Sequence, residues 1–115
     1  MTGLTRETVT KRHADRSTMD AFSFSFFCDI CEVEWRSARY KFNPGDYTAL
    51  KNSVMYRMLW NDQHAAAYER AKRDAGFEFN RCPMCGRGVC NDCFYLSGTG
   101  VSDICVDCLK NLANE

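Results

Sequence analysis

Eight cysteines are the strongest chemical signal in this chain of 115 residues. They form four Cys-x-x-Cys pairs: Cys28/Cys31, Cys82/Cys85, Cys90/Cys93 and Cys105/Cys108. Two residues between cysteines let both sulfurs of a tight turn face one metal ion, while backbone amides of the turn donate to the thiolates. The four pairs therefore predict two closed four-thiolate sites and leave no cysteine over.

A redox or disulfide role is the alternative interpretation of a Cys-x-x-Cys pair. We find no apolar stretch that suits a signal peptide and no segment of about 20 apolar residues that would span a bilayer. We therefore expect a cytoplasmic protein, in which thiols stay reduced and metal binding is favoured over disulfides. Two structural Zn²⁺ ions are the expected cofactors, although the thiolates would also accept iron.

The separations between the pairs indicate which pairs share an ion. They are 50, 4 and 11 residues. If the second and third pairs shared an ion, the four-residue connection would have to form a very tight loop. An interleaved arrangement avoids this: site 1 would contain Cys28, Cys31, Cys90 and Cys93, and site 2 would contain Cys82, Cys85, Cys105 and Cys108. A sequential arrangement, first pair with second and third with fourth, remains open.

The run from Cys82 to Leu112 resembles the second half of a FYVE-type zinc finger. As in that family, glycine follows the second pair (Gly86), and the third pair begins after four residues. The last pair follows an apolar residue, Ile104, and leads into a short segment with leucine. The resemblance implies a small α+β domain with a treble-clef, cross-braced fold and two zinc ions, as in FYVE and, more distantly, RING domains.

The resemblance extends beyond that run only to Cys28 and Cys31. FYVE domains that bind phosphatidylinositol 3-phosphate carry a run of basic residues and histidines, whereas residues 76–81 here contain one arginine, Arg81, and no histidine. A W-x-x-D motif before the first pair is also missing, and RING domains usually include a histidine ligand. The resemblance therefore implies the metal ligands and not the lipid site.

We expect residues 1–20 to form a flexible polar arm and residues 21–115 a single double-zinc domain. Alternation in Phe22–Phe26 predicts a half-buried strand that leads into Cys28, and a returning strand is expected over 33–42, before a turn at 43–46. A short helix is expected over 107–112.

A helical insertion is predicted over about 46–75 from apolar residues at three- and four-residue spacing. It is expected as two helices with a break at Trp60-Asn61, or as one long helix. Asp46 and Asp62 are the expected N-caps, and Gly76 suits a left-handed residue after the end. The insertion could cap the metal core, form a dimer interface or bind a partner.

The chain's charge argues against a general affinity for phosphate. Fifteen basic and fifteen acidic residues balance, and eight thiolates with two Zn²⁺ would make the loaded protein formally about −4. No catalytic motif is present, and closed sites have no open coordination position, so we do not expect an enzyme. We expect a module for protein–protein interaction that presents a helical face and Phe22–Phe27 as an edge strand.

Two other functions remain open. Nucleic-acid binding would need one contiguous basic face, formed by Arg70, Lys72, Arg73, Arg81 and Arg87; a solvated helix face with a Glu69–Lys72 ion pair is favoured. A RING-like role in ubiquitin transfer would need an exposed apolar groove around Ile30 and Val106. Membrane binding is not expected.

Histidine and aromatic residues are the last candidates. His64 is expected on a solvated helix face or in a core hydrogen bond rather than at a metal, and His13 lies in the expected arm. Most aromatic residues are expected in the core, because a small zinc domain has little else to bury; they are Trp35, Tyr40, Phe42, Trp60, Tyr68, Phe77 and Phe79. For the same reason the metal-free protein should be largely unfolded.

Overall fold

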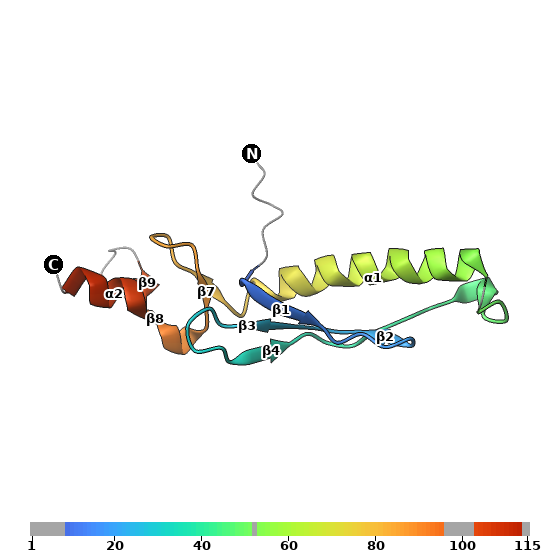
Figure 1. Cartoon of the computed structure of the whole chain (residues 1–115), viewed down its shortest axis with the longest axis horizontal. Coiled ribbons are helices and arrows are strands. Elements are labelled where there is room, and N and C mark those ends of the chain that lie inside the picture. The colour runs from blue at the N-terminus through green and yellow to red at the C-terminus, as the bar shows by residue number, and fades with distance from the viewer. Residues whose placement is uncertain (1–8, 52, 96–102, 114–115) are drawn as a thin grey trace.

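A computed structural model describes residues 9–51, 53–95 and 103–113. The protein is elongated, with extents of 64 × 30 × 20 Å (Figure 1). A long helix lies along the strands of the amino-terminal half, and the cysteine-rich segments occupy the opposite end with a second, short helix. No helix of the described residues is long and apolar enough to cross a membrane. The architecture is a small α+β fold, as predicted.

The strands form one three-stranded sheet and three small pairs within the described ranges. In the sheet, β3 (Phe24–Phe27) lies between β1 (Arg12–Asp15) and β4 (Glu34–Arg36), and all pairings are antiparallel. The two-stranded pairs are β2 (Ala21–Phe22) with β5 (Tyr40–Lys41), β6 (Asn80–Arg81) with β7 (Gly88–Val89), and β8 (Phe94–Tyr95) with β9 (Ile104–Cys105). The helices are α1 (Val54–Ala75) and α2 (Val106–Ala113), with 3₁₀ turns η2 (Gly45–Tyr47) and η3 (Asn91–Cys93).

The expected flexible arm is wrong for residues 9–20, and its first eight residues lie outside the described part. Strand β1 pairs with β3 from Arg12 opposite Phe27 to Asp15 opposite Phe24. The ring of His13 lies 6.0 Å from that of Phe26 and 5.8 Å from that of Tyr68. The polar composition of this segment gives no indication of this strand. Strand β1 supplies hydrogen-bond partners for the backbone groups of β3 on the side that β4 does not cover.

The alternation of phenylalanine and serine is present, but the strand is buried on both faces. Phe22 and Phe24 face α1, where their rings lie 5.1 Å from Trp60 and 5.2 Å from Tyr68 respectively. Ser25 is fully buried on the other face, where it receives a hydrogen bond from Arg16 Nε at 3.2 Å and donates to Glu34 Oε2. The half-buried prediction was therefore wrong, since hydrogen bonds replace solvent on the serine face. The expectation of an edge strand over Phe22–Phe27 was also wrong, because β3 is central.

The helical insertion is one continuous helix, α1, preceded by η2. Its N-cap is Ser53, whose Oγ accepts a hydrogen bond from the Tyr56 amide at 3.0 Å. Neither Asp46 nor Asp62 caps the helix, and Trp60-Asn61 lies inside it. Gly76 has φ −60°, so the predicted left-handed residue is not formed. The helix simply relaxes into a turn there, with the Gly76 amide bonded to the Lys72 carbonyl.

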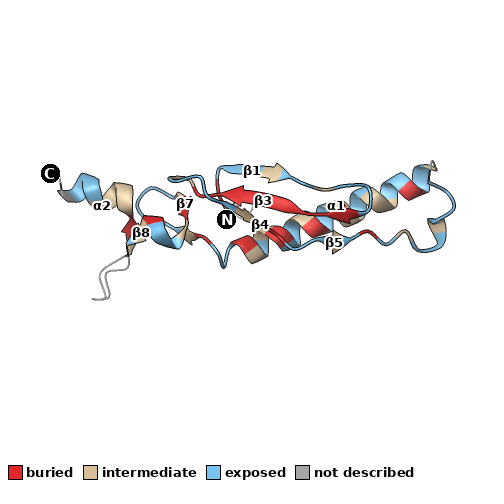
Figure 2. Cartoon of the chain, turned by 90° about the horizontal axis from the view of Figure 1, so that it is seen from below, coloured by how far each residue is buried: buried red, intermediate tan, exposed pale blue. Residues whose placement is uncertain are grey.

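Small side chains let α1 approach the strands closely. Ala67, Ala71 and Ala75 recur every four residues and are all buried, while Ala65 is exposed. Figure 2 shows buried and exposed segments alternating along α1. Because residues four apart share one face, the three alanines form a continuous stripe. Larger residues in this stripe would push the helix away from β2 and β3, which it contacts.

We predict that Ala71→Leu destabilises the metal-loaded protein by about 1–3 kcal/mol, because Ala71 is completely buried and the added carbons overpack the interface. Urea unfolding followed by circular dichroism measures this. Ala65→Leu is the matched control and should change stability by less than about 0.5 kcal/mol. Equal losses for both variants would contradict the close helix–strand contact.

Candidate metal centre

The first cysteine pair occupies a tight turn between β3 and β4. The Cys28 amide donates to the Val33 carbonyl, and the Glu32 amide donates back to the Cys28 carbonyl, both at 3.0 Å. Glu32 itself adopts a left-handed conformation with φ 64°, which closes the turn. Both sulfurs of the pair contact Cys90, which follows β7: Cys31 Sγ lies 3.6 Å from Cys90 Sγ, and Cys28 Sγ accepts a hydrogen bond from the Cys90 amide.

The structure gathers the cysteines into two groups of four. One contains Cys28, Cys31, Cys90 and Cys93, and the other contains Cys82, Cys85, Cys105 and Cys108. Within each group the sulfurs all lie within 4.8 Å of one another. This is the interleaved arrangement that the spacing of the pairs favours, and the sequential arrangement is not formed.

The sulfur separations fit a tetrahedral ion rather than disulfides. Cys31 and Cys90 have sulfurs 3.6 Å apart, and the Cys82–Cys108 and Cys85–Cys105 separations are 3.8 and 3.7 Å. Four thiolates at about 2.3 Å from a zinc ion would be about 3.8 Å apart, whereas a disulfide requires about 2.05 Å. The donor set of each group therefore fits a metal ion with four sulfur ligands.

Backbone amides donate to one buried sulfur in each group. Cys28 Sγ accepts hydrogen bonds from the amides of Ile30 and Cys90 at 3.4 Å, and Cys82 Sγ accepts one from the Cys105 amide at 3.4 Å. Burial alone would raise both thiol pKa values, but these amide hydrogen bonds outweigh it. They lower the pKa of Cys28 to about 7 and that of Cys82 to about 6.

The pKa values of two other thiols, one in each group, are raised. Burial and the neighbouring sulfurs raise the pKa of Cys93 above its usual range, and the same causes raise the pKa of Cys108 to about 12. Close thiols cannot all ionise unless a cation compensates their charge. Each group therefore contains one thiol that ionises easily, Cys28 or Cys82, and at least one, Cys93 or Cys108, that would lose its proton only when a cation binds.

Asp29, inside the first cysteine turn, joins this turn to β7 and to the segment before β1. It was not identified from the sequence. Its carboxylate accepts hydrogen bonds from the amide of Lys11 at 2.9 Å and from the amide of Gly88 at 2.8 Å, and its own amide donates to the Gly88 carbonyl. The backbone of Val9 also passes close to Gly88. A Cβ at position 88 would overlap the carbonyl oxygen of Val9, so this position needs glycine. An Asp within a Cys-x-x-Cys turn is the only sequence signal for this role.

Charged side chains near the second cysteine group are already engaged. Arg87 Nη1 lies 2.6 Å from Asp107 Oδ2, and Arg81 donates to the Gly86 carbonyl. Both arginines were candidates for phosphate binding, but they stabilise the turns that contain Cys85 and Cys108.

His64 lies far from both cysteine groups along the chain and contacts other residues. Its Nε2 lies 2.7 Å from Asp15 Oδ2, and its ring stacks on that of Trp60 at 4.9 Å. His64 is half-buried and its hydrogen bond to the exposed Asp15 lies at the surface, so the residue combines features of both predicted alternatives, a solvated helix face and a hydrogen bond beside the core. Of the candidate aromatic residues, Phe42 and Phe79 are buried, several pack at the core boundary, and Phe77 is 88 % exposed.

Comparisons of the chain with protein-family models, with curated proteins and with solved structures found no match. The cysteine groups and the surfaces around them are therefore the features that indicate the function.

The cysteine grouping predicts which substitutions remove the same ion. We expect Cys31→Ser and Cys90→Ser each to leave one bound metal, and the double variant also to leave one, because both residues belong to the first group. Combining Cys31→Ser with Cys85→Ser should remove both ions. Native mass spectrometry counts the metals; loss of both ions from the Cys31/Cys90 double variant would contradict this grouping.

We predict that metal affinity rises with pH. Cys93 and Cys108 have raised pKa values, so metal binding at neutral pH releases their protons, and acid opposes binding. Apparent affinity should therefore fall by at least about ten-fold for each pH unit lost below neutrality. Competition with a chelator of known proton affinity, between about pH 5 and 8, measures this. An affinity independent of pH would show that the thiols are not the ligands.

Proposed function

We propose that the protein is a zinc-stabilised treble-clef module of a reducing compartment such as the cytoplasm, and that it binds another protein rather than catalysing a reaction. Zinc is supported by the two sets of four thiols, whose sulfurs all lie within 4.8 Å of one another in each set. The cross-braced fold is supported by the interleaved groups, by the β6–β7 hairpin that contains Cys82 and Cys85, and by α2, which begins directly after Cys105. A closed four-thiolate shell has no position for substrate or water.

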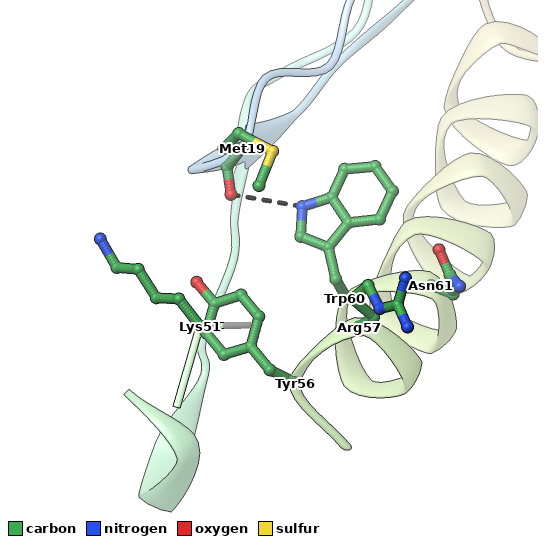
Figure 3. A pocket seen from close by; sticks show the side chains of 6 residues that line it. All are labelled: Met19, Lys51, Tyr56, Arg57, Trp60 and Asn61. Atoms are coloured by element: carbon green, nitrogen blue, oxygen red, sulfur yellow. Dashed lines mark hydrogen bonds between the residues drawn. The ribbon is translucent and has the colours of Figure 1, made fainter. Parts of the chain in front are cut away.

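The observation on which the binding role rests is an apolar surface at the amino-terminal end of α1. Its members are exposed apolar side chains: Met19, Leu50, Val54, Met55 and Met58. We call this set the α1 tip. One member, Met19, also lines a hollow of about 470 Å³, together with Tyr56 and Trp60 from a neighbouring face of α1 (Figure 3). Methionine-rich exposed surfaces adapt to the shape of apolar partners.

The amino-terminal end of α1, which carries most of the α1 tip, is fixed by contacts with the segments before β2 and after β5. The indole Nε1 of Trp60 donates to the Met19 carbonyl at 3.2 Å (Figure 3), and the ring of Tyr56 packs edge-on against Phe42 at 5.4 Å. A pre-organised surface loses less entropy on binding. The hollow is also lined by Lys51 and Arg57, so we expect a partner with an apolar side chain flanked by carboxylates.

The nucleic-acid alternative has less support. Arg70 lies over the ring of Tyr40 at 5.0 Å, and Lys72 forms the expected ion pair with Glu69 at 3.2 Å. Four of the five basic residues considered for phosphate binding, Arg70, Lys72, Arg81 and Arg87, thus make contacts within the molecule. For the RING-like alternative, the two residues expected to form its groove, Ile30 and Val106, are partly buried against the core.

We expect Met58→Glu to weaken partner binding at least ten-fold, or about 1.4 kcal/mol, because it places a charge in the α1 tip. Ala65→Glu adds the same charge to an exposed position farther along the same helix and is the control. A photo-crosslinking residue at position 58 identifies the partner, which is then purified and titrated calorimetrically against both variants.

Metal content, measured on every variant, verifies that each one is folded. Equal binding by Met58→Glu and Ala65→Glu, or the absence of any crosslinked protein from position 58, would contradict the proposed role of the α1 tip. A crosslinked oligonucleotide would favour the nucleic-acid alternative.

A further inference from the structure

A second candidate surface lies at the open edge of β4, at the metal end of the molecule. In the described part of the sheet, β4 is paired on one side only, with β3. An edge strand presents unpaired backbone groups that can accept another strand. β1 is the other edge of the described sheet, and both edges carry charged side chains; β4 is distinguished by a groove that its residues line.

The hydrogen-bond pattern identifies the unpaired groups of β4. The Cys28 amide donates to the Val33 carbonyl, and the Ser37 amide donates to the Phe24 carbonyl. Since antiparallel pairing alternates, residues 33, 35 and 37 direct their backbone groups toward β3. Glu34 and Arg36 therefore direct their amides and carbonyls toward the open edge. These four groups match the spacing of one short extended strand.

A groove lies beside this edge and has about 420 Å³ of space. Val33, Glu34 and Trp35 of the β4 region line one part, and Glu78, Phe79, Asn91 and Asp92 line another. We call it the β4 groove. Trp35, whose ring is 6.1 Å from that of Phe26, and the buried Phe79 supply its apolar surface.

The β4 groove is negatively charged, which favours a positively charged ligand. Three carboxylates line it, from Glu34, Glu78 and Asp92, and no lysine or arginine does. Glu34 is already paired with Arg16 and Arg36 at 3.5 and 3.6 Å, so the net attraction comes from Glu78 and Asp92. Two ligands of the first cysteine group, Cys31 and Cys90, also line the groove and add negative charge.

We propose that the β4 groove binds an extended, lysine- or arginine-rich segment of a partner protein, which adds to the sheet as a strand beside β4. Its backbone would bond to the outward groups of Glu34 and Arg36, and alternate basic side chains would face Glu78 and Asp92. A second copy of this chain is disfavoured, because β4–β4 pairing would bring the same carboxylates together. The proposal adds a second contact surface to the proposed binding function.

A peptide titration tests the proposal on the metal-loaded full chain. The probe is a fluorescent peptide of seven residues in which lysine alternates with threonine, and anisotropy measures its binding. We expect saturable binding that weakens with salt. The peptide with glutamate in place of lysine should not bind, because it would face like charges. The same peptide methylated on alternate backbone nitrogens should also fail, since it loses strand hydrogen bonds.

Protein variants locate the peptide. Glu78→Lys combined with Asp92→Lys should weaken binding about ten-fold or more, because attraction becomes repulsion at two positions. Asp46→Lys, an exposed change in η2 at the opposite end of the molecule, should leave binding unchanged. Arg36→Pro and Arg36→Ala both remove the side chain, but only the proline also removes the outward amide, so Arg36→Pro should weaken binding more.

The outcomes distinguish this inference from the proposed function. No binding of the lysine peptide, binding unaffected by the Glu78/Asp92 double change, or equal binding of the methylated peptide would overturn the β4 groove as a strand-addition site. Met58→Glu should leave peptide binding unchanged, so failure here would not affect the test of the α1 tip. Metal counting by native mass spectrometry verifies that each variant retains both ions.

Discussion

The first cysteine group is the constraint on which the rest of the structure depends. Cys31 and Cys90 are 59 positions apart in the chain, yet their sulfurs lie 3.6 Å from each other. Everything between them, including β4, β5, α1, β6 and β7, is a loop closed at this point. Closing so long a loop costs conformational entropy, and a four-thiolate metal ion would offset that cost. Asp29 reinforces the closure by joining the same turn to Gly88 and Lys11.

The thin shape of the molecule explains why such closure is needed. The apolar core is one layer of aromatic rings between α1 and the strands, and alanines form much of the helix side of it. Small alanine side chains allow close packing but bury little apolar surface per residue. The metal end contributes several of the fully buried residues, among them Cys28, Cys82, Cys105 and Val89. Core and metal groups are therefore one continuous stabilising unit, and the cluster of buried residues includes both.

The spacing of the cysteine pairs favours the interleaved grouping but does not determine it. The four-residue connection between Cys85 and Cys90 disfavours a site shared by the second and third pairs and leaves the sequential arrangement open, which the fold decides against. Sequence reasoning failed for β1 and for the serine face of β3, where the deciding contacts are non-local. Arg16 and Glu34, which cover Ser25, are distant from one another in the chain. Likewise, the cap of α1 depends on Ser53 rather than on two equally suitable aspartates, a choice that local propensity does not make.

The order of the ligands along the chain has a consequence for biosynthesis. Cys28 precedes Cys90 by 62 positions, and every ligand of the second group lies at or beyond Cys82. During translation, neither group can be completed until the carboxy-terminal cysteines leave the ribosome. The phenylalanines of β3 and two unliganded thiols are exposed throughout that interval, when aggregation and oxidation compete with folding. The first group is complete once Cys93 has emerged and the second only after Cys108, so metal binding would be a late step for the nascent chain and could begin at the first group.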